Sequence, residues 1–327
     1  MSDKPNLLVL GENVLTHADH LARYFTVFDV TGESDAGAYL DAIGPSIQGL
    51  AIAGGAEPRG DAQLFDKLAN LTIVAAIGVG YSMVDAKEVL RRGILMTHGP
   101  GSNAASVADL GIGLMLSVSR RIVYFDAYTR RQAWAETASK GGYTSTPTGK
   151  TMGIIGLGAI GSAVARRAAG FDMDILYHQR TRRVDCEYRY FDNVREMAAA
   201  ADYLMICVPA TDATHHMVGA EVLEALGPDG YLVNISRGLV VNEDALVAAL
   251  ISGAIAGAGL DVFQNEPHVR PELTEAHNVA LSPHRAAFTH ESTLRMRDML
   301  TANLRAHFGG LQVPSPVKGF EHLMAKY

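Results

Sequence analysis

The chain of 327 residues is longer than one ordinary hydrophobic core supports, which predicts two domains. Hydrophobic residues make up 48% of it and charged residues 19%, a globular composition that excludes wholesale disorder. The 28 basic and 35 acidic side chains give a net charge of −7, and no basic run is long enough to follow a phosphate backbone, so nucleic acid is not an expected partner.

The first third of the chain contains short runs rich in Val, Ile and Leu that predict buried strands. Continuous apolar runs that alternate with helical spacing are typical of a parallel sheet covered by helices on both faces. The predicted strands are residues 6–10, 49–53, 72–76 and 94–97.

Residues 104–138 predict two consecutive helices. The first is apolar and ends near Arg120 and Arg121, and the second carries Tyr124, Tyr128 and Trp134. A polar stretch with several glycines, residues 140–150, predicts a loop that leads into a second sheet.

A second series of apolar runs predicts that sheet. Its strands are residues 151–155, 174–177, 203–207, 231–235, 257–262 and 279–282, with helices such as 159–169 and 243–251 between them. From Thr289 onward the tail is predicted to be helical. Its apolar stripe is expected to pack back on the first domain and consists of Met296, Met299, Leu300 and Leu304.

The apolar segments and the cysteines indicate an aqueous, reducing compartment. The run 7–10 is too short for a signal-peptide core, and the most apolar segment, 110–118, is too short to span a bilayer. Cys186 and Cys207 make no disulfide framework, and the histidines do not follow metal-ligand spacing. We expect a cytoplasmic protein with no membrane partner and no metal site.

A glycine pattern directly follows the predicted strand 151–155 and opens a predicted helix. Its six residues are Gly156, Leu157, Gly158, Ala159, Ile160 and Gly161. In this context the glycines permit a tight turn, the approach of a pyrophosphate and close helix packing, while the helix N-terminus faces the anion. The pattern predicts a dinucleotide-binding turn; the alternative is a glycine-rich turn that only packs.

The end of the next predicted strand carries arginines instead of an acid. A carboxylate there would accept hydrogen bonds from the ribose of NAD, and none is present in the sequence YHQRTRR. Arg180, with Arg182 or Arg183 nearby, suits the 2′-phosphate of NADP because guanidinium pairs with phosphate in a bidentate way. We predict NADP(H) in preference to NAD(H); the alternative is a solvated basic loop with mixed preference.

Three further motifs follow strands of the second series. The sequences NISRG, DVFQNEP and SPHR carry Arg237, Glu266 and His284 in that order. Reduction of a 2-oxo acid requires these groups: a cation for the carboxylate, a proton donor for the carbonyl oxygen and an acid that stabilises the protonated donor. Each of these residues, taken alone, could instead have a purely structural role. Because all three lie in the same domain as the glycine turn, together they predict an active site.

These motifs resemble those of the D-isomer-specific 2-hydroxyacid dehydrogenases. The resemblance covers practically the whole chain and rests on GLGAIG, NISRG, GAGLDVFQNEP and SPHRAAFT, with residues 78–80 and 107–109 as further landmarks. The arginine-bearing stretch 178–180, with 54–58 and 221–228, makes the chain most similar to the NADPH-dependent glyoxylate/hydroxypyruvate reductase branch.

The resemblance implies an α/β protein of two doubly wound parallel-sheet domains. Residues 99–288 would form a Rossmann-type NADP-binding domain, while residues 1–98 and 289–327 would form a flavodoxin-like substrate domain, with the cleft between them. The region near 104–143 resembles the helical arm through which such enzymes form homodimers.

The resemblance also implies the roles of individual residues. Arg237 would hold the substrate carboxylate and carbonyl, His284 would donate the proton, and Glu266 would orient His284. The backbone amides of Val79 and Gly80 would bind the carboxylate as well. Besides the glycine turn, the implied cofactor contacts are Gln179, Arg180, Thr181, Val208, Pro209, Thr214, Ile235, Ser236, Arg237, Asp261 and His284.

The implied activity is the NADPH-dependent reduction of glyoxylate and hydroxypyruvate to glycolate and D-glycerate by a homodimer. Two departures from the family pattern leave the identity of the acceptor open. The family usually has an acidic residue within two positions after Gly80, whereas here residues 81–83 intervene, and Arg285 and Phe288 stand where the family more often has small or aliphatic residues. One alternative is a reductase of bulkier 2-oxo acids such as phenylpyruvate. Another is a dinucleotide-sensing interaction protein that resembles the transcriptional corepressors of this fold.

Overall fold

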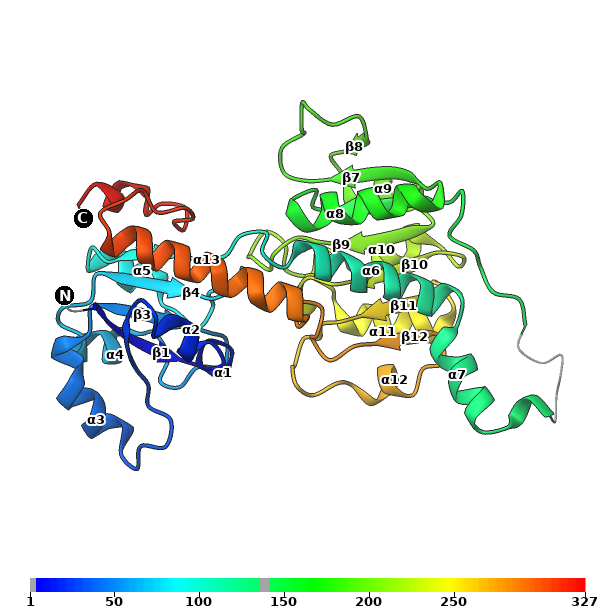
Figure 1. The fold of residues 1–327 in the computed structure, drawn as a ribbon. Coiled ribbons are helices and arrows are strands. Elements are labelled where there is room, and N and C mark those ends of the chain that lie inside the picture. The colour runs from blue at the N-terminus through cyan, green and yellow to red at the C-terminus, as the bar shows by residue number, and fades with distance from the viewer. Residues whose placement is uncertain (1–3, 136–141, 327) are drawn as a thin grey trace. The chain divides into compact units, whose positions relative to one another are not determined.

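The computed structural model describes residues 4–135 and 142–326. The chain divides into two compact units: the first consists of Met1–Asn103 and His290–Tyr327, and the second of Ala104–Thr289. Each unit has a parallel sheet of its own, of five and of seven strands (Figure 1). The predicted fold class, two parallel-sheet α/β domains, is confirmed.

The sheet of the first unit has the order β2-β1-β3-β4-β5, with every neighbouring pair parallel. Its strands are β1 (Asn6–Leu10), β2 (Thr26–Phe28), β3 (Gly49–Ile52), β4 (Ile73–Ala76) and β5 (Leu95–Thr97). The helices around it are α1 (Glu12–Leu15), α2 (Ala18–Leu21), α3 (Ala36–Ile43), α4 (Ala62–Lys67), α5 (Ala86–Arg91) and α13 (His290–Phe308). Asp35, Asp61 and Asp85 begin α3, α4 and α5, because each carboxylate accepts hydrogen bonds from backbone N–H groups of the first turn.

The predicted packing of the C-terminal tail is confirmed for its helical part. Leu300 and Leu304 of α13 are buried in the core of the first unit, and the helix packs against β4 (Figure 1). The prediction that the whole tail is helical is wrong, because α13 ends at Phe308 and Gly310 has a φ of +65°, a conformation that suits glycine after a helix. The chain then pairs with the end of β5, and a short helix, η5 (Glu321–Lys326), follows.

The sheet of the second unit has the order β12-β11-β10-β9-β6-β7-β8, again wholly parallel. Its strands are β6 (Thr151–Ile155), β7 (Asp174–His178), β8 (Arg189–Phe191), β9 (Tyr203–Ile206), β10 (Tyr231–Asn234), β11 (Gly257–Leu260) and β12 (Val279–Leu281). Two hydrophobic cores lie on the two faces of this sheet.

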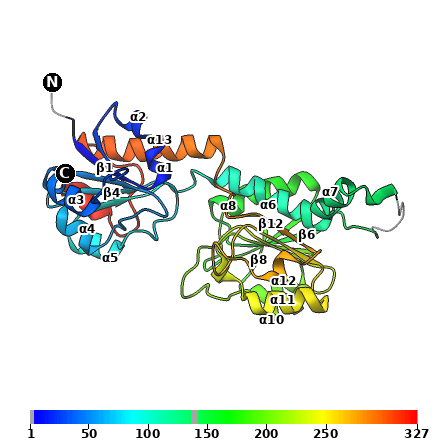
Figure 2. The ribbon, with the colours of Figure 1, turned by 90° about the horizontal axis from the view of Figure 1, so that it is seen from below.

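Helices cover both faces of the larger sheet (Figure 2). One face carries α6 (Ala104–Ser119) and α8 (Ala159–Ala168), and the other carries α9 (Val194–Ala199), α10 (Ala220–Leu226) and α11 (Glu243–Ser252). Glycines let α6 lie close to the sheet: an added Cβ on Gly259 of β11 would lie 2.9 Å from Leu114 Cβ, and one on Gly111 of α6 would lie 2.8 Å from Ile235 Cδ1. A short helix, α12 (Pro271–Thr274), precedes β12.

The second helix predicted between residues 104 and 138 is shorter than expected. It is α7 (Ile122–Arg130), and Trp134 lies in a separate short helix, η2 (Ala133–Ala135), after Gln132 with its positive φ of 60°. Residues 136–141 lie outside the described residues, and with them the predicted end of this helix and the start of the loop that follows. No helix in the described parts of the chain is both long and apolar enough to cross a membrane.

Candidate active site

The strand order of the larger sheet brings the predicted motifs to one edge. All seven strands are parallel, so the segments that follow them lie at the same edge. His284 follows β12, Glu266 follows β11 and Arg237 follows β10, while the glycine turn follows β6 and Arg180 follows β7. The chain goes from β6 to β7 on one side and returns to β9 on the other, so β6 and β9 flank the switch point at which open α/β sheets bind ligands.

The turn after β6 has the geometry of an anion cradle. An added Cβ on Gly156, whose φ is +93°, would lie 2.6 Å from Val208 Cγ1, and one on Gly161 would lie 2.0 Å from the Gly156 oxygen. An added Cβ on Gly158 would meet no described atom within 4 Å. Helix α8 begins after Gly158 with no side-chain cap and no acid in its first turn, so its first N–H groups face an open space. These residues fit a dinucleotide pyrophosphate.

The segment after β9 forms a closed turn beside the glycine turn. Thr214 Oγ1 accepts a hydrogen bond from the Thr211 N–H at 2.8 Å and donates one to the Pro209 oxygen at 2.7 Å. Val208 contacts the glycine turn at the position where Gly156 lacks a side chain. Burial raises the pKa of the neighbouring Cys207 thiol to about 12, which favours its protonated form.

The loop after β7 holds its three arginines in different ways. Gln179 Nε2 donates to the Thr181 oxygen at 2.5 Å, which shapes the loop around Arg180. Arg180 and Arg182 are exposed, and no residue in the described ranges forms a hydrogen bond or ion pair with either guanidinium. Both are therefore available to a phosphate.

Arg183 is already engaged by the protein. Its guanidinium pairs with Asp185 at 2.7 Å and donates to the Leu157 oxygen and to Ser162 Oγ, both at 3.3 Å. The hydrogen bond from Arg183 lowers the pKa of the Asp185 carboxyl. Arg183 thus ties the β7 loop to the glycine turn, a role that the sequence alone did not distinguish from that of its two neighbours.

Asn234, at the end of β10, holds the backbone that carries Arg237. Its buried side chain accepts hydrogen bonds from the Ser236 N–H at 3.0 Å and from Ser236 Oγ at 2.9 Å, and donates to the Arg237 oxygen at 3.0 Å. The Arg237 side chain is exposed, and its Nη1 donates to the Ser236 oxygen at 2.6 Å. Ile235, which directly follows Asn234 in the sequence, is buried and anchors this segment in the core.

The segments after β10 and β11 are in backbone contact at Gly238. An added Cβ there would lie 2.0 Å from the Phe263 carbonyl carbon and oxygen, so only glycine fits. Glu266 Oε1 accepts a hydrogen bond from the Phe263 N–H at 3.1 Å, and Glu266 Oε2 lies 2.7 Å from His284 Nδ1. The structure therefore brings together Glu266 and His284 as predicted.

The His284–Glu266 pair remains open to solvent. The two side chains are 42% and 35% exposed, and no described residue contacts His284 Nε2 through a hydrogen bond. Because the carboxylate engages Nδ1–H, Nε2 is the ring nitrogen that is free to exchange a proton with a substrate. This is the arrangement that a proton donor requires.

Asp261 holds the turn on which His284 lies. It is 1% exposed; its Oδ1 accepts hydrogen bonds from Ser282 Oγ at 2.6 Å and the Arg285 N–H at 2.8 Å, and its Oδ2 accepts one from the Ala286 N–H at 3.1 Å. His284 has a φ of +52°, which is strained for a residue with a side chain. The family resemblance indicates a cofactor contact for Asp261, and the structure adds that its carboxylate stabilises this strained turn.

Val79 and Gly80 belong to the first unit, in the segment that follows β4. Neither of their backbone N–H groups donates a hydrogen bond to any residue that the structure describes. Both groups are thus available to an anion, as the resemblance predicts for the substrate carboxylate.

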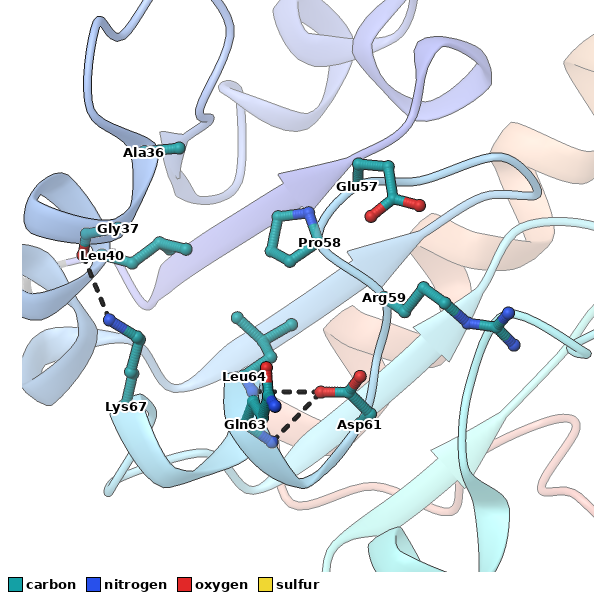
Figure 3. A pocket seen from close by; sticks show the side chains of 10 residues that line it. All are labelled: Ala36, Gly37, Leu40, Glu57, Pro58, Arg59, Asp61, Gln63, Leu64 and Lys67. Atoms are coloured by element: carbon teal, nitrogen blue, oxygen red, sulfur yellow. Dashed lines mark hydrogen bonds between the residues drawn. The ribbon is translucent and has the colours of Figure 1, made fainter.

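A pocket of about 460 Å³ in the first unit lies between α3 and the segment that leads into α4 (Figure 3). Two of its charged side chains bond to the protein itself: Asp61 accepts the hydrogen bonds of the first turn of α4, and Lys67 donates to the Gly37 oxygen at 3.2 Å. None of the predicted site residues lines this pocket.

Comparison with known proteins identifies the family. Residues 112–286, which include Arg237, Glu266, His284 and the glycine turn, match the D-isomer specific 2-hydroxyacid dehydrogenase, NAD binding domain. The hydroxyphenylpyruvate reductase of Plectranthus scutellarioides is 43% identical over 267 residues, which cover 82% of this chain and 85% of that protein. The chain belongs to the D-isomer specific 2-hydroxyacid dehydrogenases.

Two further comparisons concern reductases of small 2-oxo acids. The dehydrogenase is 41% identical over 267 residues to the glyoxylate/hydroxypyruvate reductase A of Arabidopsis thaliana, covering 82% of this chain and 85% of that one. It also resembles the solved NADPH-dependent glyoxylate/hydroxypyruvate reductase of Sinorhizobium meliloti in complex with NADP and malonate. That structure has a TM-score of 0.85 and 37% identity, with 98% of each chain covered.

Proposed function

We propose that this dehydrogenase uses NADPH to reduce glyoxylate and hydroxypyruvate to glycolate and D-glycerate. The observation that carries the proposal is the 2.7 Å hydrogen bond between His284 and Glu266, at the sheet edge that also carries Arg237 and the glycine turn. The glyoxylate/hydroxypyruvate reductases among its relatives support this choice of substrates.

A dinucleotide held at the glycine turn of residues 156–161 would supply the hydride that reduces the keto carbon. Arg237 binds the substrate carboxylate and the carbonyl oxygen, because a guanidinium offers several donors in one plane, and it stabilises the negative charge that develops on that oxygen. His284 Nε2 donates the proton to the same oxygen. Glu266 fixes the tautomer of His284 and stabilises its protonated form, and the N–H groups of Val79 and Gly80 bind the carboxylate.

The preference for NADPH rests on the loop after β7. Arg180 is exposed and free of protein partners in the described chain, and no acid occurs in residues 177–183 to repel a 2′-phosphate. Charge-assisted hydrogen bonds from Arg180 favour the phosphorylated cofactor. The presence of NADP in the Sinorhizobium meliloti reductase agrees with this preference.

The dehydrogenase acts as a homodimer in this proposal. Ile122 and Val123 of α7 are 50% and 57% exposed, and Trp134 of η2 is 66% exposed. Large apolar side chains gathered on one arm favour burial against a second copy of the chain. Sedimentation velocity of the wild type and of Ile122→Asp tests this, with a dimer that dissociates in the variant as the expected result.

A second candidate substrate class is the aromatic 2-oxo acids. The hydroxyphenylpyruvate reductase among the relatives favours it, as does the exposed Phe288, whose ring lies 4.3 Å below the Arg285 guanidinium, four residues after His284. Aromatic substrates stack readily on such surfaces.

A substrate panel at fixed NADPH tests both candidates. We expect kcat/KM for glyoxylate and hydroxypyruvate to exceed that for phenylpyruvate and hydroxyphenylpyruvate by at least about tenfold, a difference of about 1.4 kcal/mol in transition-state binding. The opposite order would establish the aromatic class instead. Absence of NADPH oxidation with every 2-oxo acid would refute the enzymatic role.

A further inference from the structure

Two hydrogen bonds connect the segment after β4 to the segment after β5. The Gly99 N–H donates to the Gly78 oxygen at 2.5 Å, and His98 Nδ1 lies 3.0 Å from the Val79 oxygen. A carbonyl oxygen can only accept, so the histidine ring is the donor. Because β4 and β5 are neighbouring parallel strands, these contacts follow from the sheet topology.

Each of these bonds fixes the direction of one backbone N–H group. In a trans peptide the C=O of one residue and the N–H of the next lie in one plane and point in opposite directions. The bond to the Gly78 oxygen therefore orients the N–H of Val79, and the bond from His98 to the Val79 oxygen orients the N–H of Gly80. A donor on the carbonyl also polarises the peptide, which makes its N–H a stronger donor.

The backbone of His98 is itself held by buried groups. Its N–H donates to the Ser315 oxygen at 3.2 Å, and its oxygen accepts hydrogen bonds from Ser315 Oγ at 2.7 Å and from Asn303 Nδ2 at 3.2 Å. Asn303 and Ser315 are 1% and 8% exposed. The edge contact with the Tyr81 ring, with centroids 5.6 Å apart, fixes the imidazole. Helix α13 and the chain after it thus hold the backbone of His98, and with it the position from which the ring Nδ1–H points at the Val79 oxygen.

We propose that His98 is a positioning residue for the substrate carboxylate, because its ring holds the Val79–Gly80 peptide with the Gly80 N–H directed at the anion. This inference rests on the proposed function, in which the N–H groups of Val79 and Gly80 bind the carboxylate of a 2-oxo acid. It assigns His98 no contact with the substrate itself.

Three substitutions separate the hydrogen bond from the bulk of the ring. His98→Ala removes the donor. His98→Asn keeps an N–H close to the position of Nδ1, whereas His98→Gln carries its amide one carbon further, near the position of Nε2. We expect His98→Ala and His98→Gln to raise the KM for glyoxylate about tenfold, equivalent to about 1.4 kcal/mol, and His98→Asn to recover most of that loss.

The kinetic pattern distinguishes positioning from a general loss of structure. A carboxylate contact that is equally strong in the ground state and the transition state affects KM and not kcat. We therefore expect the kcat of the variants to stay within about threefold of the wild type, and their KM for NADPH to stay unchanged. Thermal unfolding of each variant provides the control for folding. A wild-type KM in His98→Ala, or equal changes in His98→Asn and His98→Gln, would overturn the proposal.

Binding of oxalate separates this inference from the proposed reaction. Calorimetric titration of oxalate into the NADP-loaded wild type and into His98→Ala measures carboxylate binding without turnover. We expect the dissociation constant to rise about tenfold in the variant. If the wild type binds oxalate but reduces no 2-oxo acid, the proposed function fails while His98 keeps its role; equal binding by both proteins, or none by the wild type, overturns the role.

Discussion

The two ends of the carboxyl edge of the larger sheet are organised differently. After β10, β11 and β12, buried polar side chains hold the backbone under the reacting groups: Asn234 under Arg237, and Asp261 under His284. After β7, Arg180 and Arg182 extend into solvent and have no partner in the described chain. In the proposed function, proton transfer and charge stabilisation would thus take place on a hydrogen-bonded frame, whereas cofactor selection would rely on exposed side chains.

The physical demands on the two ends explain the difference. A proton donor must lie within hydrogen-bond reach of its acceptor, and small misplacements of a reacting group are costly in rate. A phosphate contact tolerates more freedom, because ordering an arginine costs at most about 2 kcal/mol and charge-assisted bonds offset that cost.

The largest effects are expected at the rigid end. Arg237→Ala and His284→Ala should each lower kcat with glyoxylate by at least about a hundredfold, since the first removes the positive charge that stabilises the developing oxyanion and the second removes the proton donor. NADPH binding, measured by nicotinamide fluorescence, should persist in both. Near-normal turnover of either purified variant would refute the role assigned to it.

Asp261→Asn tests whether the frame under His284 matters to the reaction. An amide directs N–H groups at backbone donors that the carboxylate now satisfies, so we expect kcat to fall about tenfold and the free energy of unfolding to fall by about 1–3 kcal/mol. Steady-state kinetics and urea unfolding measure the two effects. A destabilised variant with unchanged kcat would show that this buried acid serves the fold alone.

Arg180→Ala tests the exposed end. Loss of a charge-assisted contact should lower kcat/KM for NADPH about tenfold or more and leave kcat/KM for NADH within about twofold. The matched control is Arg182→Ala, two residues along the same exposed loop, with a smaller expected effect. If Arg180→Ala loses nothing with NADPH, another group binds the 2′-phosphate.

Arg183→Ala should give the smallest effect and a different pattern. This side chain bonds to Leu157 and Ser162 rather than extending into solvent. Its loss should therefore raise the KM for NADPH and the KM for NADH about threefold each and leave the ratio of the two KM values unchanged. Measurement of KM for NADPH and NADH checks this. A selective loss of NADPH would move Arg183 into the group of direct phosphate contacts.

The sequence predicts the buried strands and the motifs at their ends, because continuous apolar runs and glycine spacing are local signals. It misses β2 and β8, which are three-residue edge strands without a buried apolar run. It also misses the partners that depend on tertiary contacts: the bonds of Asp261 join residues 21 to 25 apart, and His98 reaches a carbonyl 19 residues away in the segment that follows a neighbouring strand. Such pairs exist only once the sheet has formed.

The absence of space at Gly238 has a practical consequence for redesign. Since its backbone touches that of Phe263, even a methyl group would push apart the segments bearing Arg237 and Glu266. The guanidinium and the acid therefore cannot be adjusted independently through this contact: a shift in one is transmitted to the other. Efforts to widen the acceptor range of this enzyme should leave position 238 untouched and vary side chains that do not bridge the two segments.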